Sequence, residues 1–217
     1  MIATMGPRLG PVYHALWTDV AWLHVKWKEY QALYGEKASR VEILNRAAAL
    51  FFRIVQDVIW EDTLLHLARL TDPPRSVGKE NLTVRALPGL VDDADLRGEL
   101  EEMLEDLQLQ TAFARDWRNR HIAHRDLAAS LGGKVTPLAR AGRDQVEEAL
   151  RAVAAVLNHV NMFFSRPEAA FDQVIAPMTG SVTLLHVLRD GLEADEQRQA
   201  RLKAGKPDPD DWKHREL

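Results

Sequence analysis

The 217-residue sequence has a formal net charge of −4 and a pI near 6.1, which argues against a protein that coats nucleic acid through a broad basic surface. It contains no cysteine, so a disulfide framework, a thiolate zinc site and a thiol nucleophile are excluded. No apolar run approaches the roughly 20 residues that cross a bilayer, and glycine and proline interrupt residues 6–11, where a signal peptide would lie; we therefore expect a cytoplasmic protein with no membrane partner.

The first third of the chain predicts two long helices. Residues 1–10 are expected to form a loose arm, and apolar residues then recur every three or four positions over residues 11–34, as on one face of a helix. Ser39 lies three residues before Glu42, a capping-box spacing that begins a second helix, which runs to Leu70. The apolar stripe expected on this second helix consists of Val41, Leu44, Ala48, Phe51, Val55, Val58 and Leu65.

Helical patterns also cover the rest of the chain. Prolines at 73 and 74 end the second helix, a polar loop follows, and Asp92 or Asp93 can cap a third helix that leads into residues 115–126. A fourth helix is expected over residues 144–164, and another over 182–203. The pattern predicts an all-α, up-and-down bundle of four main helices. We expect the bundle over residues 1–165, a helical extension packed on it over 166–205, and a disordered tail over 206–217.

Residues 115–126 are the densest group of chemically active side chains, with four arginines, two histidines and only two carboxylates in twelve residues. Arginine carries a permanent, forked cation that suits phosphate, and histidine exchanges protons near neutral pH. An arginine and a histidine held together can cleave RNA without a metal ion. Arg- and His-rich helical segments also occur as solvated faces or as networks paired with nearby acids, which is the structural alternative.

The order of these residues resembles the signature of the HEPN superfamily. Arg118 is followed by the polar residue Asn119 and, after four more residues, by His124. The surrounding segment is similar to the AbiU-type, abortive-infection branch, and so is a second block at residues 67–73 and 79–83. The resemblance covers roughly residues 12–164. It implies a helical bundle, an endoribonuclease, and a homodimer in which two copies of the motif meet in a cleft.

The resemblance also implies roles for individual residues. His124 would act as general base or acid when the 2′-hydroxyl attacks the phosphorus, and Arg118 would stabilise the charge on the phosphate oxygens. Asn119 would orient the phosphate or the histidine. RNA-binding or supporting roles fall to Arg115, Arg120, His121, Arg125 and Asp126. No metal or other cofactor is expected; the expected partners are RNA, a second copy of the chain and a cognate antitoxin.

Helical geometry leaves the identity of the working cation open. On an ideal α-helix Arg118 lies about 120° from His124 around the axis, whereas Arg120, four residues before His124, lies on the same face. The family pattern favours Arg118 and straight helical geometry favours Arg120; we prefer Arg118.

The C-terminal half of the second helix carries candidates that would support the motif: Asp62, His66 and Arg69. Asp62 falls on the apolar stripe and needs a partner, for which we expect an arginine of the motif. Asp62 and His66 share a face and could bind a metal, but such a pair is more often an internal hydrogen bond. Two other functions remain open: a catalytically silent domain that binds RNA or a nucleotide, and a helical interaction protein with a structural Arg/His network.

Overall fold

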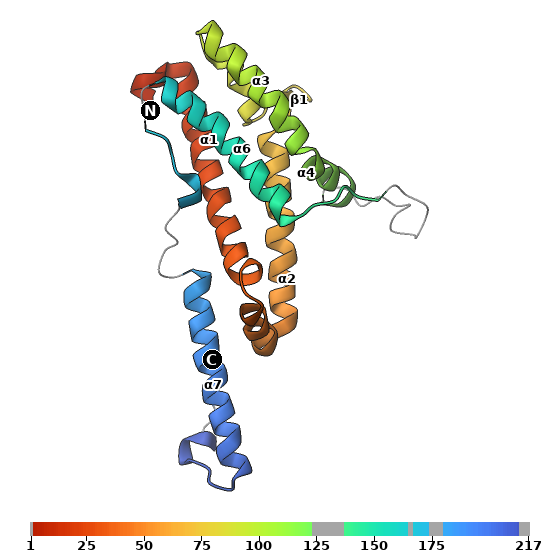
Figure 1. Ribbon diagram of the computed structural model, residues 1–217, viewed down its shortest axis with the longest axis vertical. Coiled ribbons are helices and arrows are strands. Elements are labelled where there is room, and N and C mark those ends of the chain that lie inside the picture. The colour runs from red at the N-terminus through yellow and green to blue at the C-terminus, as the bar shows by residue number, and fades with distance from the viewer. Residues whose placement is uncertain (1, 123–136, 165–166, 174–179, 213–217) are drawn as a thin grey trace. The chain divides into compact units, whose positions relative to one another are not determined.

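The computed structural model describes residues 2–122, 137–164, 167–173 and 180–212. Figure 1 shows that these residues are almost entirely helical, which confirms the predicted all-α fold. The α-helices are α1 (Ile2–Tyr30), α2 (Ala38–Leu70), α3 (Ala94–Gln110), α4 (Ala112–Trp117), α6 (Arg143–Phe163) and α7 (Ser181–Lys203). The up-and-down order of four main helices stays a prediction. None of the described helices is long and apolar enough to cross a membrane.

Short elements connect the helices. Two π-helical segments, η1 (Gln31–Gly35) and η4 (Arg118–Ile122), follow α1 and α4. Strands β1 (Arg75–Ser76) and β2 (Lys79–Glu80) pair antiparallel within the loop that was expected to be irregular. Their turn has positive φ at both central residues, Val77 and Gly78, as a type I′ hairpin turn requires. The 3-10 helices are η2 (Val84–Ala86), η3 (Pro88–Leu90), η5 (Phe171–Gln173) and η6 (Pro209–Trp212).

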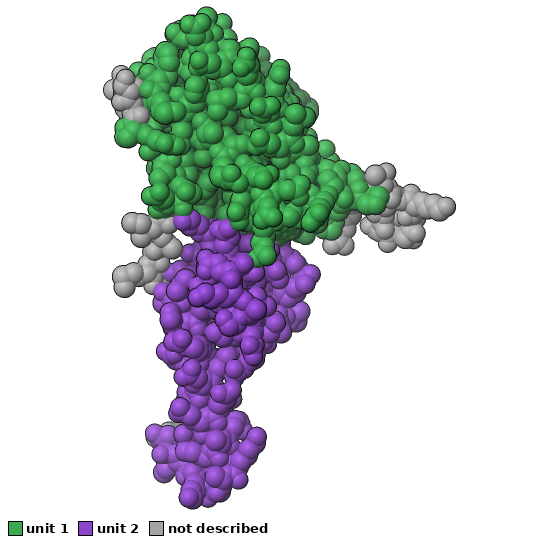
Figure 2. Space-filling view, in the orientation of Figure 1, with its two compact units in different colours: residues 1–27, 58–175 green, residues 28–57, 176–217 purple. Residues whose placement is uncertain are grey.

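The chain divides into two compact units (Figure 2). One comprises residues 1–27 and 58–175, and the other comprises residues 28–57 and 176–217. The candidate motif belongs to the first unit, in which α3 packs along α6 (Figure 1). The core of the second unit is small and contains Leu33, Leu44, Phe52 and Leu185. The domain boundaries expected near residues 165 and 205 stay predictions.

The prediction of a loose arm at residues 1–10 is wrong for the described residues, because α1 already begins at Ile2. Gly6 interrupts the helix with a φ of 75°, a left-handed conformation that glycine adopts readily. Pro7 then restarts the helix, and its fixed φ suits a first helical position. Met5 and Leu9 are buried on either side of this break, so the arm is held by apolar contacts that lie outside the expected stripe.

The stripe expected on α2 is wrong at Ala48, Phe51 and Val58, which are exposed, whereas Val55 and Leu65 are partly buried. The backbone leaves the helical region at Ala48, where φ is −163° and ψ is 73°. The break shifts the phase of the buried face, so that Leu44 is buried as expected but Phe51 and Val58 are each 59% exposed. The buried side chains beyond the break are instead Phe52, Leu64 and Leu67. A single periodic stripe assumes an unbroken helix, and α2 does not meet that condition.

The neighbouring phenylalanines of α2 give a matched test of which face of the helix is buried beyond Ala48. Phe52 is 5% exposed, whereas Phe51 is 59% exposed. We expect Phe52→Ala to lower the free energy of unfolding by about 3–5 kcal/mol, because it leaves a cavity in a small core. Phe51→Ala should change it by less than about 1 kcal/mol. Denaturant unfolding followed by circular dichroism measures both values. Equal losses of unfolding free energy in the two variants would contradict the burial of Phe52 in place of Phe51.

The segment that follows α2 is hydrogen-bonded to the C-terminal end of that helix. The hydroxyl of Thr83 lies 2.7 Å from the carbonyl oxygen of Leu70 and 2.8 Å from that of Asp72. Asp93, rather than Asp92, caps α3, because its Oδ1 accepts a hydrogen bond from the backbone N–H of Leu96 at 2.9 Å. Thr111 forms the short joint between α3 and α4. These ties fix the end of α2 and the start of α4 next to one another.

Candidate functional site

The motif begins where α4 gives way to the π-helical segment η4. Arg118, Asn119, Arg120 and His121 lie in η4, whose hydrogen bonds span one residue more than those of an α-helix. The angle of about 120° between Arg118 and His124 holds for an ideal α-helix only and therefore does not apply to this segment. His124, Arg125 and Asp126 lie outside the described residues.

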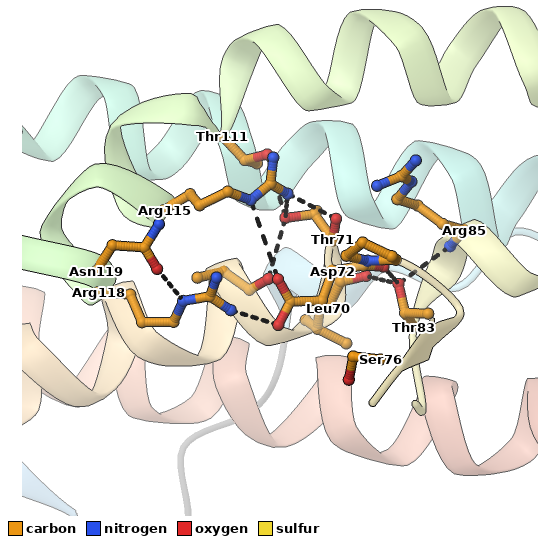
Figure 3. Close-up of polar contacts among 12 residues, drawn as sticks. Leu70, Thr71, Asp72, Ser76, Thr83, Arg85, Thr111, Arg115, Arg118 and Asn119 are labelled. Atoms are coloured by element: carbon orange, nitrogen blue, oxygen red, sulfur yellow. Dashed lines mark hydrogen bonds and ion pairs between the residues drawn. The ribbon is translucent and has the colours of Figure 1, made fainter. Parts of the chain in front are cut away.

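Arg118 and Asn119 form one half of a polar cluster at the end of α2 (Figure 3). Nη1 of Arg118 donates to Oδ2 of Asp72, and Nε donates to the side-chain oxygen of Asn119 at 3.0 Å. Both partners of the ion pair keep some exposure, 22% for the Arg118 side chain and 19% for that of Asp72. Within the described part of the chain, Nη2 of Arg118 has no hydrogen-bond partner. The guanidinium is thus held by two groups and still presents a donor.

Arg115 forms the other half of the cluster. Its Nη2 donates to the carbonyl oxygen of Thr71 at 2.7 Å and lies 3.3 Å from the Thr71 hydroxyl, which the Thr111 hydroxyl also contacts at 3.3 Å. Nε of Arg115 is 4.0 Å from Oδ1 of Asp72. Burial lowers the pKa of the Arg115 guanidinium; the Asp72 carboxylate opposes this shift, and the positive charges of Arg118 and Arg85 add to it.

Arg120 has a different environment, which suits a structural role. Its Nη1 lies 3.2 Å from Oδ1 of Asp116 and donates to the carbonyl oxygen of Pro137 at 3.2 Å. The same Asp116 accepts from the backbone N–H of Ala139 at 2.8 Å, and the Trp117 indole donates to the Ala139 carbonyl at 2.8 Å. Arg120 therefore holds the segment that leads into α6, whereas Arg118 faces Asp72.

His121 faces α2. Its Nε2 lies 3.4 Å from Oε1 of Glu61, and both side chains are about two-fifths exposed. The Trp117 ring meets the imidazole edge-on with 5.4 Å between ring centroids. Two carboxylates thus contact the described part of the motif: Glu61 on α2, which meets His121, and Asp72 just after α2, which meets Arg118.

Asp62, for which an arginine of the motif was expected, instead receives a hydrogen bond at Oδ2 from Lys26 of α1, and none of the described arginines of the motif pairs with it. Lys26 also lies 3.2 Å from Nδ1 of His66, and Nε2 of His66 lies 2.8 Å from Oδ2 of Asp19. Because an ammonium group only donates, Nδ1 must accept, and the ring proton of neutral His66 lies on Nε2, the nitrogen nearest to Asp19. This turn of α2 faces α1: the contacts of Asp62 and His66 with the described residues are to Lys26 and Asp19.

Arg69 was expected to support the motif. Its side chain is exposed, and its positive charge lowers the pKa of His66. Conversely, the role of Asp72 was missed. Its signal lay in the block at residues 67–73 that resembles the AbiU-type branch and contains Asp72. Among the described residues, no three carboxylate, histidine or cysteine side chains group as metal ligands would.

Stability should depend on pH through His66. Burial lowers its pKa and outweighs the hydrogen bond and charge of Asp19, which raise it; Lys26 and Arg69 lower it further. The folded state then binds the proton less tightly than the unfolded state. Neutral His66 contributes fully to the free energy of unfolding above the pKa of about 6.5 that it has in the unfolded chain. This contribution is lost as the pH falls below that value towards the lower pKa of His66 in the folded protein.

We expect the free energy of unfolding to decline between about pH 7 and pH 5, and His66→Gln to make that decline shallower. The exposed histidine of α1, His14, offers a control, since His14→Gln should reproduce the wild-type profile. Urea unfolding at a series of pH values gives these slopes. A His66→Gln slope as steep as that of the wild type would show that other groups cause the decline.

Comparison with known proteins adds one finding to this geometry. A family model described as AbiU2, of the HEPN type, matches residues 7–176, which confirms the resemblance on which the motif was identified. The matched span contains α1 from Pro7 onward, all of α2 and the Arg115–Asp72–Arg118 cluster. No curated protein and no solved structure matches the chain.

Proposed function

The chain belongs to the AbiU2 family of HEPN-type abortive-infection proteins, and we propose that it is a metal-independent endoribonuclease that acts in the cytoplasm as an anti-phage toxin. The observation that carries the proposal is the setting of Arg118. Asp72 and Asn119 hold its guanidinium, both partners of the ion pair stay partly exposed, and Nη2 still offers a donor. A planar fork held in this way suits the oxygens of a phosphodiester.

The proposed reaction needs no cofactor. The 2′-hydroxyl of the RNA attacks the adjacent phosphorus, a base takes its proton, and an acid protonates the departing 5′-oxygen. We assign the proton transfer to His124 and the stabilisation of the phosphate oxygens to Arg118. Asn119, which holds Nε of Arg118, is a positioning residue. Arg120 is excluded from the role of working cation in this proposal because Asp116 and Pro137 engage it.

A homodimer follows from the need for two proton-transfer groups. One chain offers a single histidine at the family position, and one histidine does not readily serve as base and acid in the same step. We expect sedimentation equilibrium at micromolar concentration to give twice the 24.5 kDa of one chain. The exposed Trp22 of α1 is consistent with a covered surface. A monomer that cleaves RNA at full rate would contradict the proposed homodimer.

One observation favours the alternative of a structural network. Asp72 neutralises Arg118 and lies near Arg115, and Thr71 and Thr111 join the same cluster. Incubation of the protein with tRNA and mRNA in EDTA separates the two functions. The ribonuclease predicts cleavage that depends on His124, whereas a structural network predicts no cleavage. A silent RNA- or nucleotide-binding domain predicts binding alone. A cognate antitoxin, the remaining expected partner, would suppress cleavage when added to the same assay.

A further inference from the structure

Arg85 lies next to the candidate site and carries a positive charge that has no role in the proposed reaction. It lies in η2, and its backbone N–H donates to the hydroxyl of Thr83 at 3.3 Å. Thr83 in turn is bonded to the carbonyl oxygens of Leu70 and Asp72. The backbone at Arg85 is therefore tied to the turn that carries Asp72. Figure 3 shows its guanidinium on the same side of that turn as the guanidinium of Arg115.

The cations of this cluster outnumber its acids. Arg85 and Arg118 both lie close enough to Arg115 to act on its charge, and Asp72 is the carboxylate that opposes them. Arg85 is half-buried and forms no ion pair or side-chain hydrogen bond with any residue that the structure describes. Among the described residues, the cluster thus contains three guanidinium groups and one carboxylate, an excess of two positive charges.

Such an arrangement destabilises the free protein. Like charges in a partly buried setting repel one another more strongly than at an open surface, and no described side chain pairs with Arg85 to offset this repulsion. An anion that binds between the guanidinium groups would attract each of them and so offset their mutual repulsion. Phosphate fits best, because its oxygens can accept from several guanidinium forks at once. Arg115 is suited to such a site because Thr71 holds its guanidinium in place.

We propose that Arg85, together with Arg115 and Arg118, forms a subsite for a phosphate of the RNA backbone beside the phosphate that is cleaved. The identity of the ligand as RNA rests on the proposed function. Arg118 contacts the scissile phosphate and Arg85 contacts a neighbouring one, with Arg115 between them. Arg85 is thus a substrate-binding residue that lies more than 30 positions before the family motif.

The test uses an RNA oligonucleotide whose 2′-hydroxyls are methylated, so that binding is measured without cleavage. Fluorescence anisotropy over a series of KCl concentrations gives the dependence of log K on log salt for the full-length chain. Arg85→Gln should weaken binding several-fold and make the slope shallower by about 0.7, the value for one lost phosphate contact on a single strand. Arg85→Lys should keep most of the slope. Arg189→Gln, on α7 of the other unit, is the control and should match the wild type.

Thermal unfolding separates a binding role from a structural one. Because Arg85 repels Arg115 in the free protein, Arg85→Gln should melt at the wild-type temperature or above it, even though it binds RNA more weakly. A lower melting temperature, or an unchanged salt slope, overturns the subsite. Inorganic pyrophosphate that raises the wild-type melting temperature but not that of Arg85→Gln supports it without RNA.

The failures of the two proposals are distinguishable. If the wild type cleaves natural RNA and Arg85→Gln binds the methylated oligonucleotide as well as the wild type does, the subsite is wrong and the ribonuclease stands. If Arg85→Gln loses affinity and the wild type never cleaves, the subsite stands and the ribonuclease is wrong.

Discussion

His124→Ala is expected to lower the rate of RNA cleavage by about 10²- to 10⁴-fold, the usual contribution of a general acid–base group. Binding of the methylated oligonucleotide should stay close to that of the wild type, because the phosphate-binding charge resides on the arginines. The loss should therefore appear in turnover rather than in affinity. Single-turnover cleavage in EDTA, measured beside anisotropy, gives both quantities.

Arg118→Lys is the matched variant for the cation. Lysine keeps the charge but lacks the planar fork that bonds Asp72 through one nitrogen and Asn119 through another, so cleavage should not be restored. Both variants should melt near the wild-type temperature if their roles are chemical. Variants that unfold, or stable variants that cleave normally, would falsify the assignment of these two residues.

Asp72→Asn is expected to destabilise the fold and to tighten RNA binding. The substitution removes the carboxylate that faces Arg115 and Arg118, and it leaves partly buried cations without a counter-charge. Breaking a fully buried pair costs about 3–5 kcal/mol; because the side chains of Asp72 and Arg118 keep some exposure, we expect about 1–3 kcal/mol. The same change raises the positive charge of the cluster, so the methylated oligonucleotide should bind more tightly and with a steeper salt dependence.

Asp57→Asn is the control for this change. Asp57 lies on α2 and pairs with Arg53 at 3.0 Å, and both side chains are more than half exposed. Loss of such a surface pair should cost less than about 1 kcal/mol. Denaturant unfolding of the two variants gives the comparison. If Asp72→Asn is as stable as Asp57→Asn and binds RNA no better than the wild type, Asp72 is not the counter-charge of the cluster.

The sequence by itself determined the features that arise over short distances along the chain. Helical periodicity repeats within four residues, and it correctly predicted an all-α fold and the burial of Leu16, Val20 and Leu23 on α1. The order of Arg118 and Asn119, together with the block at residues 67–73, correctly indicated the AbiU-type family. Each of these signals lies in a few consecutive residues, so no knowledge of packing was needed to recognise it.

Only the tertiary structure decided which residues face one another. The break at Ala48 moved the buried face of α2 from Phe51 to Phe52. Asp72 meets Arg118 across 46 positions, and Lys26 meets Asp62 across 36. A carboxylate on a helix can pair with whichever cation a neighbouring helix brings to it. That choice depends on how the helices pack, which local periodicity does not encode.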